Sequence, residues 1–88
     1  MATVCVHGPL KKLAGGRSEH EMAGETVCAV LRSLEAAHPG LRGWVLDERA
    51  LVRAHINVYV NGELGATDTP VAEHDRIEVL PAISGGAR

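Results

Sequence analysis

Residues 26–41 read TVCAVLRSLEAAHPGL, and this stretch decides the fold because it contains the one long amphipathic helix that the sequence predicts. The apolar residues that share one helical face after Thr26 are Val27, Val30, Leu31, Leu34 and Ala37. Thr26 suits the N-cap, since its hydroxyl can accept a hydrogen bond from a free amide of the first turn. Pro39 ends the helix, because its ring disfavours helical geometry at His38 and it has no amide hydrogen to donate.

Short segments with alternating apolar residues surround this helix and predict strands. The predicted strands are residues 3–7, a polar edge strand at 17–22 antiparallel to the first, 56–60, a brief strand at 63–64, and 76–80. Asn61-Gly62 predicts a tight turn between the third and fourth of these strands. Residues 10–16 are interpreted as a loop, and residues 41–53 as an irregular connection with a helical turn.

One helix can cover only one face of such a sheet, so the order of elements predicts the α+β class. We expect a mixed sheet of four to five strands packed on one main helix, with the last strand parallel to the first in the centre. The chain then leaves the sheet after the last strand. The sequence thus predicts a folded domain over residues 1–82 and a flexible tail over 83–88, which ends ISGGAR.

Composition excludes several classes of function. The chain has 88 residues, a net charge of −2, and Trp44 and Tyr59 as its only aromatic side chains, with no basic stripe along the sequence. A nucleic-acid partner is therefore not expected, because such partners need phosphate-binding cations or stacking rings. Two cysteines are too few for a disulfide scaffold. No signal peptide and no apolar run of about 20 residues is present, so we expect a cytoplasmic protein without a membrane partner.

Three segments together resemble the MoaD/ThiS family of sulfur carriers, in its CysO-like branch, which are ubiquitin-like β-grasp proteins. These segments are TVCAVLRSLEAAHPGL (26–41), NVYVNGE (57–63) and DRIEVLPAISGG (75–86). The loop PLKKLAGG (9–16) resembles the corresponding loop of the same family. The resemblance runs from about residue 3 to Gly86 and includes the order of helix, turn and tail.

The resemblance implies a carrier protein with no catalytic residues, bound cofactor or metal of its own. An E1-like adenylyltransferase and sulfurtransferase would use ATP to adenylate the carboxylate of Gly86 and then form a thiocarboxylate. A synthase would accept the sulfur. Glycine leaves both faces of the carbonyl open and lets Gly85 and Gly86 thread a narrow channel. Ile83 would supply an apolar contact with the partner, and Ser84 would form a short polar segment before the two glycines.

Ala87 and Arg88 depart from the family pattern, because they lock the carboxylate of Gly86 in a peptide bond. We interpret the chain as a precursor that is cut between Gly86 and Ala87. In some relatives the resemblance points to a zinc metalloprotease of the JAMM type for this step. The alternative is that Ala87-Arg88 is a remnant of cloning.

Two other functions remain open from the sequence. Gly86 of a ubiquitin-like modifier would be linked to lysines of target proteins, and an interaction-only β-grasp domain would have an inert tail. For a sulfur carrier, the acceptor can be cysteine, the molybdenum cofactor, a thiazole or a thiolated natural product. The sequence LPAISGG (80–86) resembles the cysteine-synthesis or MoaD-like branch more than the thiamine branch.

A partner-docking patch is predicted on the sheet face that points away from the helix. Strand alternation places Tyr59 and Leu80 on that face, with Arg53 and Arg76 as a charged rim. Partial cover of these two side chains by a loop is the alternative. Trp44 is interpreted as a satellite anchor of the core.

Cys5 and Cys28 are interpreted as small apolar residues with unreactive thiols. A metal site is not predicted, although His7 and His20 could meet across the first hairpin.

Overall fold

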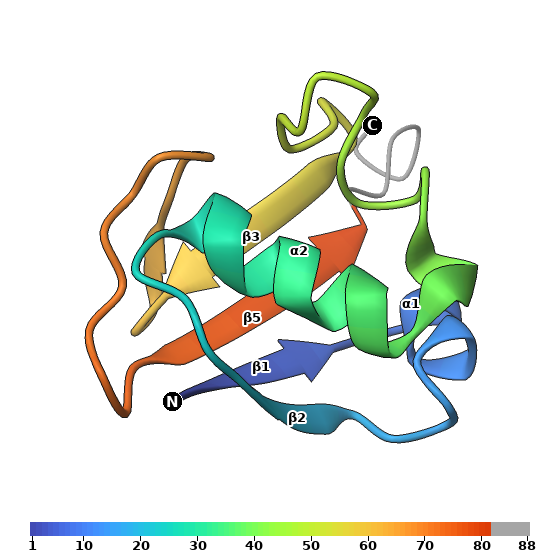
Figure 1. Cartoon of the computed structure of the whole chain (residues 1–88), viewed down its shortest axis with the longest axis horizontal. Coiled ribbons are helices and arrows are strands. Elements are labelled where there is room, and N and C mark those ends of the chain that lie inside the picture. The colour runs from blue at the N-terminus through green and yellow to red at the C-terminus, as the bar shows by residue number, and fades with distance from the viewer. Residues whose placement is uncertain (82–88) are drawn as a thin grey trace, which may run out of the picture.

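Two layers, a sheet and a helix, make up the computed structural model, which describes residues 1–81. The elements are β1 (Ala2–Val6), α1 (Pro9–Leu13), β2 (Glu19–Met22), α2 (Val27–Ala37), the 3-10 helix η1 (Pro39–Leu41), β3 (Ile56–Val60), β4 (Glu63–Leu64) and β5 (Arg76–Pro81). The strands form one five-stranded sheet in the order β2-β1-β5-β3-β4, and α2 lies across one face of it (Figure 1). The α+β class and the mixed sheet on one main helix are confirmed.

The last strand, β5, occupies the centre of the sheet. It pairs parallel with β1, where Val6 lies opposite Val79, and antiparallel with β3, where Val58 lies opposite Val79. Ile77 and Val79 of β5 are completely buried. The prediction that the first and last strands run parallel in the middle of the sheet is therefore confirmed.

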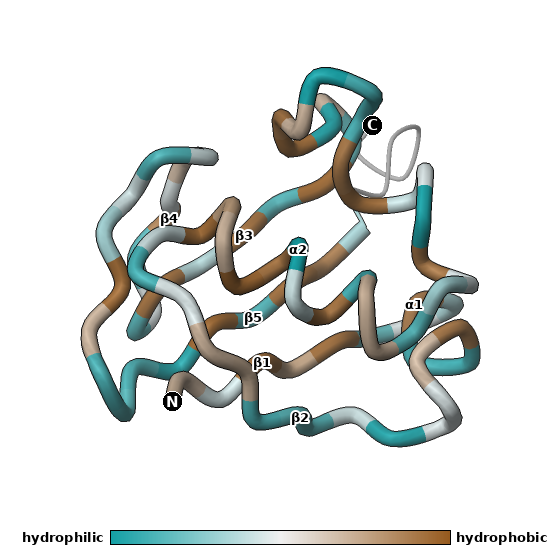
Figure 2. Tube along the Cα trace, viewed as in Figure 1, coloured by the Kyte–Doolittle hydropathy of each residue, from teal (hydrophilic) through white to brown (hydrophobic). Residues whose placement is uncertain are grey.

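The core lies between α2 and the sheet, and Figure 2 shows hydrophobic residues, in brown, recurring along α2, β1, β3 and β5. Four side chains of α2 are buried against the inward-facing valines and isoleucines of the strands: Val27, Val30, Leu31 and Leu34. Full burial of a Val or Leu side chain contributes about 1.5–3 kcal/mol, so this one helical face contributes a large share of the hydrophobic stabilisation.

Both ends of α2 are as predicted. The hydroxyl of Thr26 accepts a hydrogen bond from the amide of Ala29 at 3.1 Å, and the backbone of Thr26 is extended, as an N-cap requires. At the other end, His38 is the C-cap and Pro39 begins η1. Proline is compatible with a new first turn, since that position needs no amide donor.

The turn at Asn61-Gly62 joins β3 to β4 and also holds the start of β5. Both residues have positive φ, 52° and 87°, as a two-residue hairpin turn requires. The side chain of Asn61 donates to Asp75 Oδ1 and accepts from the amide of Arg76, both at 2.9 Å. The side-chain amide of Asn61, helped by the amide of Ala72, lowers the pKa of Asp75. The turn therefore sets where β5 begins.

Two local predictions were wrong. Residues 10–16 were interpreted as a loop, but Pro9–Leu13 form helix α1. Proline at the first position has a helical φ, and burial of Leu10 in the core stabilises the short helix. Trp44 is 49% exposed rather than a core anchor, because Leu41, Val45 and Leu46 of the same segment fill the space beneath it.

Replacing the N-cap of α2 should destabilise the fold. Thr26→Ala removes the acceptor for the amide of Ala29, which should lower the free energy of unfolding by about 1 kcal/mol. Thermal unfolding followed by circular dichroism should show a melting temperature lower by ~4–8 °C. Thr26→Ser retains the hydroxyl and should behave like the original chain. Equal losses in both variants would assign the effect to the lost methyl group.

Glu35 on α2 should limit stability at neutral pH. Its Oε2 is buried and has no hydrogen-bond partner within residues 1–81. Burial raises the pKa of Glu35, against the opposing effects of the Leu46 amide, Arg42 and Arg32. The pKa of Glu35 is 4.5 in the unfolded chain and higher in the folded protein. The free energy of unfolding therefore falls as the pH rises from the unfolded-state pKa through the folded-state pKa.

Glu35→Gln should therefore raise the free energy of unfolding at pH 7, and the gain should disappear as the pH is lowered below about 4. Urea unfolding across this pH range measures the gain in the free energy of unfolding at pH 7 and its loss at low pH. Glu48→Gln, at an exposed position, is the matched control and should change stability by less than about 0.5 kcal/mol. A loss of stability in Glu35→Gln at pH 7 would contradict this interpretation.

Candidate functional site

The described part of the chain ends with the central strand. Pro81, the last residue of β5, lies opposite Ile56 at the start of β3. A Cβ placed on Gly8 would lie 3.7 Å from Cγ of Pro81, so the end of β1 is close to the same point. The predicted tail and processing residues lie outside the described residues, as does the predicted domain boundary at residue 82: Ile83, Ser84, Gly85, Gly86, Ala87 and Arg88.

Tyr59 and Leu80 share the sheet face that points away from α2. Their neighbours Val58 and Val79 are buried on the helix side, so strand alternation places Tyr59 and Leu80 opposite. Tyr59 pairs with Glu78, which puts Leu80 one diagonal step away on the same face. Both side chains are half-buried. Their role in partner docking stays a prediction.

The two predicted rim residues lie in different places. Arg76 is on the outer sheet face, where its guanidinium lies 3.5 Å from Glu19 and 3.6 Å from Glu78. Arg53 lies before β3, in the connection that follows η1, and its amide donates to the carbonyl of Val45. The Nε of Arg53 is buried and has no hydrogen-bond partner in the described part of the chain. Only Arg76 therefore shares the sheet face with Tyr59 and Leu80.

A row of charged side chains beside Tyr59 and Leu80 was missed by the sequence analysis. Glu78 lies 3.2 Å from His7 as well as 3.6 Å from Arg76, and Arg76 reaches Glu19 on the edge strand. The signal was available, since positions 76, 78 and 80 alternate with the buried positions of β5. A partner on this face would meet an apolar pair next to a row of ion pairs.

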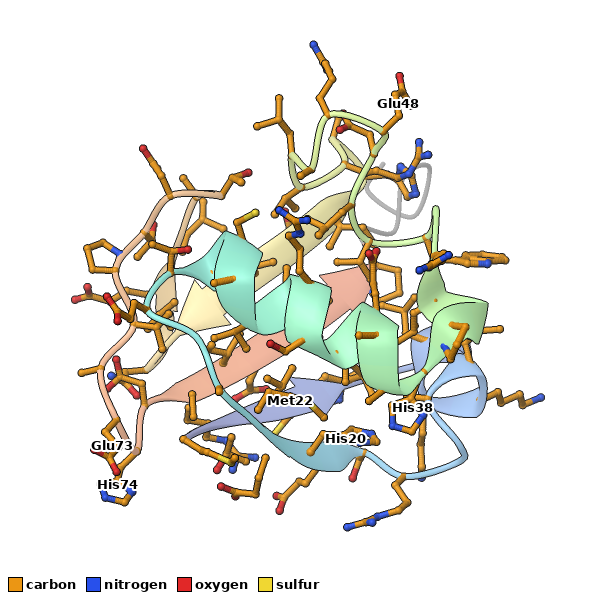
Figure 3. All side chains as sticks on the ribbon, viewed as in Figure 1. His20, Met22, His38, Glu48, Glu73 and His74 are labelled. Atoms are coloured by element: carbon orange, nitrogen blue, oxygen red, sulfur yellow. The ribbon has the colours of Figure 1, made fainter. Side chains whose placement is uncertain are left out.

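The histidines meet differently from the interpretation that paired His7 with His20. His20 is only 6% exposed, lies 2.8 Å through Nε2 from the carbonyl oxygen of Arg17, and contacts the ring of His38 edge-on at 4.8 Å (Figure 3). Because a carbonyl only accepts, Nε2 of His20 is the protonated ring nitrogen. The pair joins the edge strand to the end of α2.

Cys5 and Cys28 are both free thiols. Cys5 is buried although it points away from α2, and burial raises its pKa, with a smaller opposing effect of Arg76. A thiol held in its protonated form is a poor nucleophile. Cys28 donates to the carbonyl of Ala50 at 3.3 Å. Within residues 1–81 no group of three or more potential ligand residues is placed to hold a metal ion.

None of the helices among residues 1–81 is long and apolar enough to cross a membrane.

Comparison with known proteins identifies relatives over nearly the whole chain. The model of the ThiS family matches residues 4–86. Sulfur carrier protein CysO of Mycobacterium tuberculosis is 32% identical over 90 residues, covering 96% of this chain and 97% of the relative. Small archaeal modifier protein 1 of Haloferax volcanii is 35% identical over 79 residues, covering 88% of this chain and 91% of the relative.

Solved structures give the same result. A chain from the crystal structure of the Amycolatopsis orientalis BexX/CysO complex superposes with a TM-score of 0.87 at 31% identity, covering 98% of this chain and all of that chain. The crystal structure of Mycobacterium tuberculosis CysO superposes with a TM-score of 0.85 at 29% identity, covering 94% of this chain and all of that chain. Since both the family model and these relatives span almost every residue, the chain belongs to the ThiS family of ubiquitin-like β-grasp proteins.

Proposed function

We propose that this protein carries sulfur as a thiocarboxylate on Gly86. In this proposal the chain is not itself an enzyme and binds no cofactor, but is a co-substrate for partner enzymes. The observation that supports it most is the match of the ThiS family model to residues 4–86, together with similarity to CysO along nearly the whole chain. The matched region ends at Gly86, the residue whose carboxylate would be activated.

The chemistry begins with a poor electrophile. A free carboxylate is ionised at neutral pH and resists nucleophiles, so an E1-like partner would use ATP to convert it to an acyl-adenylate. A sulfur nucleophile then displaces AMP and leaves the thiocarboxylate. A second partner, a sulfur-accepting synthase, would use that group as the nucleophile. Its product would be cysteine, the molybdenum cofactor or a thiolated natural product.

Removal of Ala87-Arg88 must come first in this scheme. The family match stops at Gly86 and leaves both residues outside it. A JAMM-type metalloprotease suits this cut, because a zinc-bound hydroxide can attack the carbonyl of Gly86 in a groove too narrow for side chains. The zinc belongs to the protease and the ATP to the E1-like enzyme.

Protein modification is the second candidate function. It is favoured by the similarity to small archaeal modifier protein 1, at 35% identity over 79 residues. Conjugation would start from the same acyl-adenylate and would end with an isopeptide bond from Gly86 to a lysine of a target. The similarity to a chain from a BexX/CysO complex supports, for either function, a protein partner that holds this chain.

The state of Gly86 decides whether the chain can be activated. The chain ending at Gly86, incubated with the E1-like enzyme, ATP and sulfide, should gain the mass of one sulfur in place of one oxygen. The chain ending at Arg88 should remain unchanged, because its Gly86 carbonyl is in a peptide bond. Replacing Gly86 by Val in the shortened chain should abolish conversion without changing the melting temperature.

Intact-mass analysis of the protein from its native cells tests the same proposal independently. A main species that retains Arg88, with neither a shortened nor a thiocarboxylate form, would contradict sulfur transport. A ladder of higher-mass conjugates on a denaturing blot, without a thiocarboxylate, would favour modification instead.

Leu80 should contribute to partner binding more than to stability. Leu80→Asp places a charge beside Tyr59 on the outer sheet face, and we expect affinity for the E1-like enzyme to fall about tenfold or more. Leu51→Asp, at an exposed leucine outside the sheet, is the matched control and should retain affinity. Calorimetric titration and thermal unfolding measure both quantities. Parallel losses of affinity and stability in Leu80→Asp would assign Leu80 a structural role only.

A further inference from the structure

Exposed charges divide between the two ends of β5. One group, here named the basic collar, consists of Lys11, Lys12, Arg17 and Arg42. The other, named the acidic end, consists of Glu25, Glu63, Asp68 and Glu73. These residues come from separate segments of the chain, so the division exists only in the folded protein.

Lys11 and Lys12 of the basic collar lie near the end of β5, and Arg17 and Arg42 lie on segments next to α1. Lys11 and Lys12 are on α1, which begins directly after Gly8, the residue next to Pro81. Arg17 follows Gly16, whose amide donates to the carbonyl of Lys11. Arg42 is the C-cap of η1, and η1 packs on α1, where Gly40 lies against the carbonyl of Leu13.

The acidic end lies where β5 begins. Glu63 lies opposite Val60, which in turn lies opposite Ile77 near the start of β5. Glu73 is two residues before Asp75, the residue that the Asn61 turn holds. In Figure 3 Glu73 and His74 lie at one corner of the molecule, far from His38 beside α1.

The basic collar has no ion-pair partner within the described residues, although Arg42 partly offsets the burial that raises the pKa of Glu35. None of its four side chains forms an ion pair among residues 1–81. Of the acids toward this end, Asp47 pairs with Arg49, Glu19 pairs with Arg76, and the side chain of Glu35 is half-buried. Glu48, on the connection after η1, is an exposed acid without an ion pair among residues 1–81, and Figure 3 shows it apart from His38.

The two ends are far enough apart to act as separate patches. β5 has six residues, which at about 3.3 Å per residue span roughly 16 Å. The Debye length is about 8 Å at physiological ionic strength, so the acidic end does not cancel the field of the collar in solution. A charged partner therefore meets two patches of opposite sign.

We propose that the basic collar is the docking surface for the protein that receives the tail, and that this protein presents an acidic surface around the entrance to its active site. This inference rests on the proposed function, since it assumes that a partner takes residues 82–86. Pro81, the last described residue, lies next to Gly8, which directly precedes α1 with Lys11 and Lys12, so a partner that binds the residues after Pro81 also comes close to the collar. Complementary charge would orient the carrier tail first during encounter.

Association kinetics with the E1-like enzyme test the proposal. The chain ending at Gly86 is compared with a collar variant, Lys11→Gln, Lys12→Gln and Arg17→Gln, by stopped flow at increasing NaCl. The collar variant should associate about tenfold more slowly at low salt, and the difference should vanish near 0.5 M salt. The dissociation rate should change little, because rim charges act mainly on encounter.

A variant with the same change in net charge at the other end is the matched control. Ala23→Glu, Ala66→Glu and Ala72→Glu are exposed positions near the acidic end, and this variant should associate at the original rate. Equal slowing in both variants would assign the effect to net charge and overturn the proposal. Unchanged rates in the collar variant would also overturn it. Circular dichroism confirms folding, and the single variants Lys12→Gln and Ala66→Glu repeat the comparison if a triple variant unfolds.

Two further results separate this proposal from the proposed function. If the original chain forms no adenylate, the proposal of sulfur transport and the proposal of docking through the collar are both overturned. If all variants form adenylate with the same kcat/KM, only the proposal of docking through the collar is overturned. Binding of the original chain to duplex DNA, lost in the collar variant while association with the enzyme is unchanged, would assign the collar to a nucleic acid and overturn the proposal.

Discussion

The parallel pairing of β1 with β5 is the interaction on which the rest of the structure depends. It joins the first and last strands, whose buried Val4, Val6, Ile77 and Val79 form the floor on which α2 packs. Parallel neighbours cannot be joined by a tight turn, so the whole intervening chain serves as the crossover. That crossover supplies the helix, the β3-β4 hairpin and the connections. Loss of this pairing would remove the core.

The same pairing fixes where the described chain ends. Because β1 and β5 run parallel, both end at one edge of the sheet, and Gly8 lies beside Pro81 there. The short helix α1 and the 3-10 helix η1 pack together at this edge. Pro81, the last described residue, therefore lies at a packed edge of the domain, which suits the proposed role of the residues that follow it.

Two surfaces of different chemistry serve the proposed partner. The outer sheet face offers Tyr59 and Leu80 beside the ion pairs of Arg76 and Glu78. The collar offers cations that form no ion pair among residues 1–81, two of them on α1 near the end of β5. Apolar contact tends to determine how long a complex lasts, whereas charge at the rim determines how fast and in which orientation it forms. A carrier that visits several enzymes in turn needs fast encounter as well as a defined orientation.

The sequence by itself determined the main helix, the strands and their order. The period of the apolar residues in 26–37, the N-cap at Thr26, the turn at Asn61-Gly62 and the alternation of 76–80 are local signals, and each predicted its element correctly. Helix α1 was missed because its stability depends on burial of Leu10, a tertiary contact, rather than on propensity over five residues. Trp44 was misplaced for the related reason that its neighbours fill the core first.

Only the tertiary structure decided which distant residues share a surface. The side-chain contacts of Glu78 join residues 7, 76 and 78, and the collar joins residues 11, 12, 17 and 42, which show no basic stripe in the sequence. Local patterns specify elements, because propensity and periodicity act over a few residues. Surfaces depend on how strands pair and in which register, and that is a property of the whole packed chain.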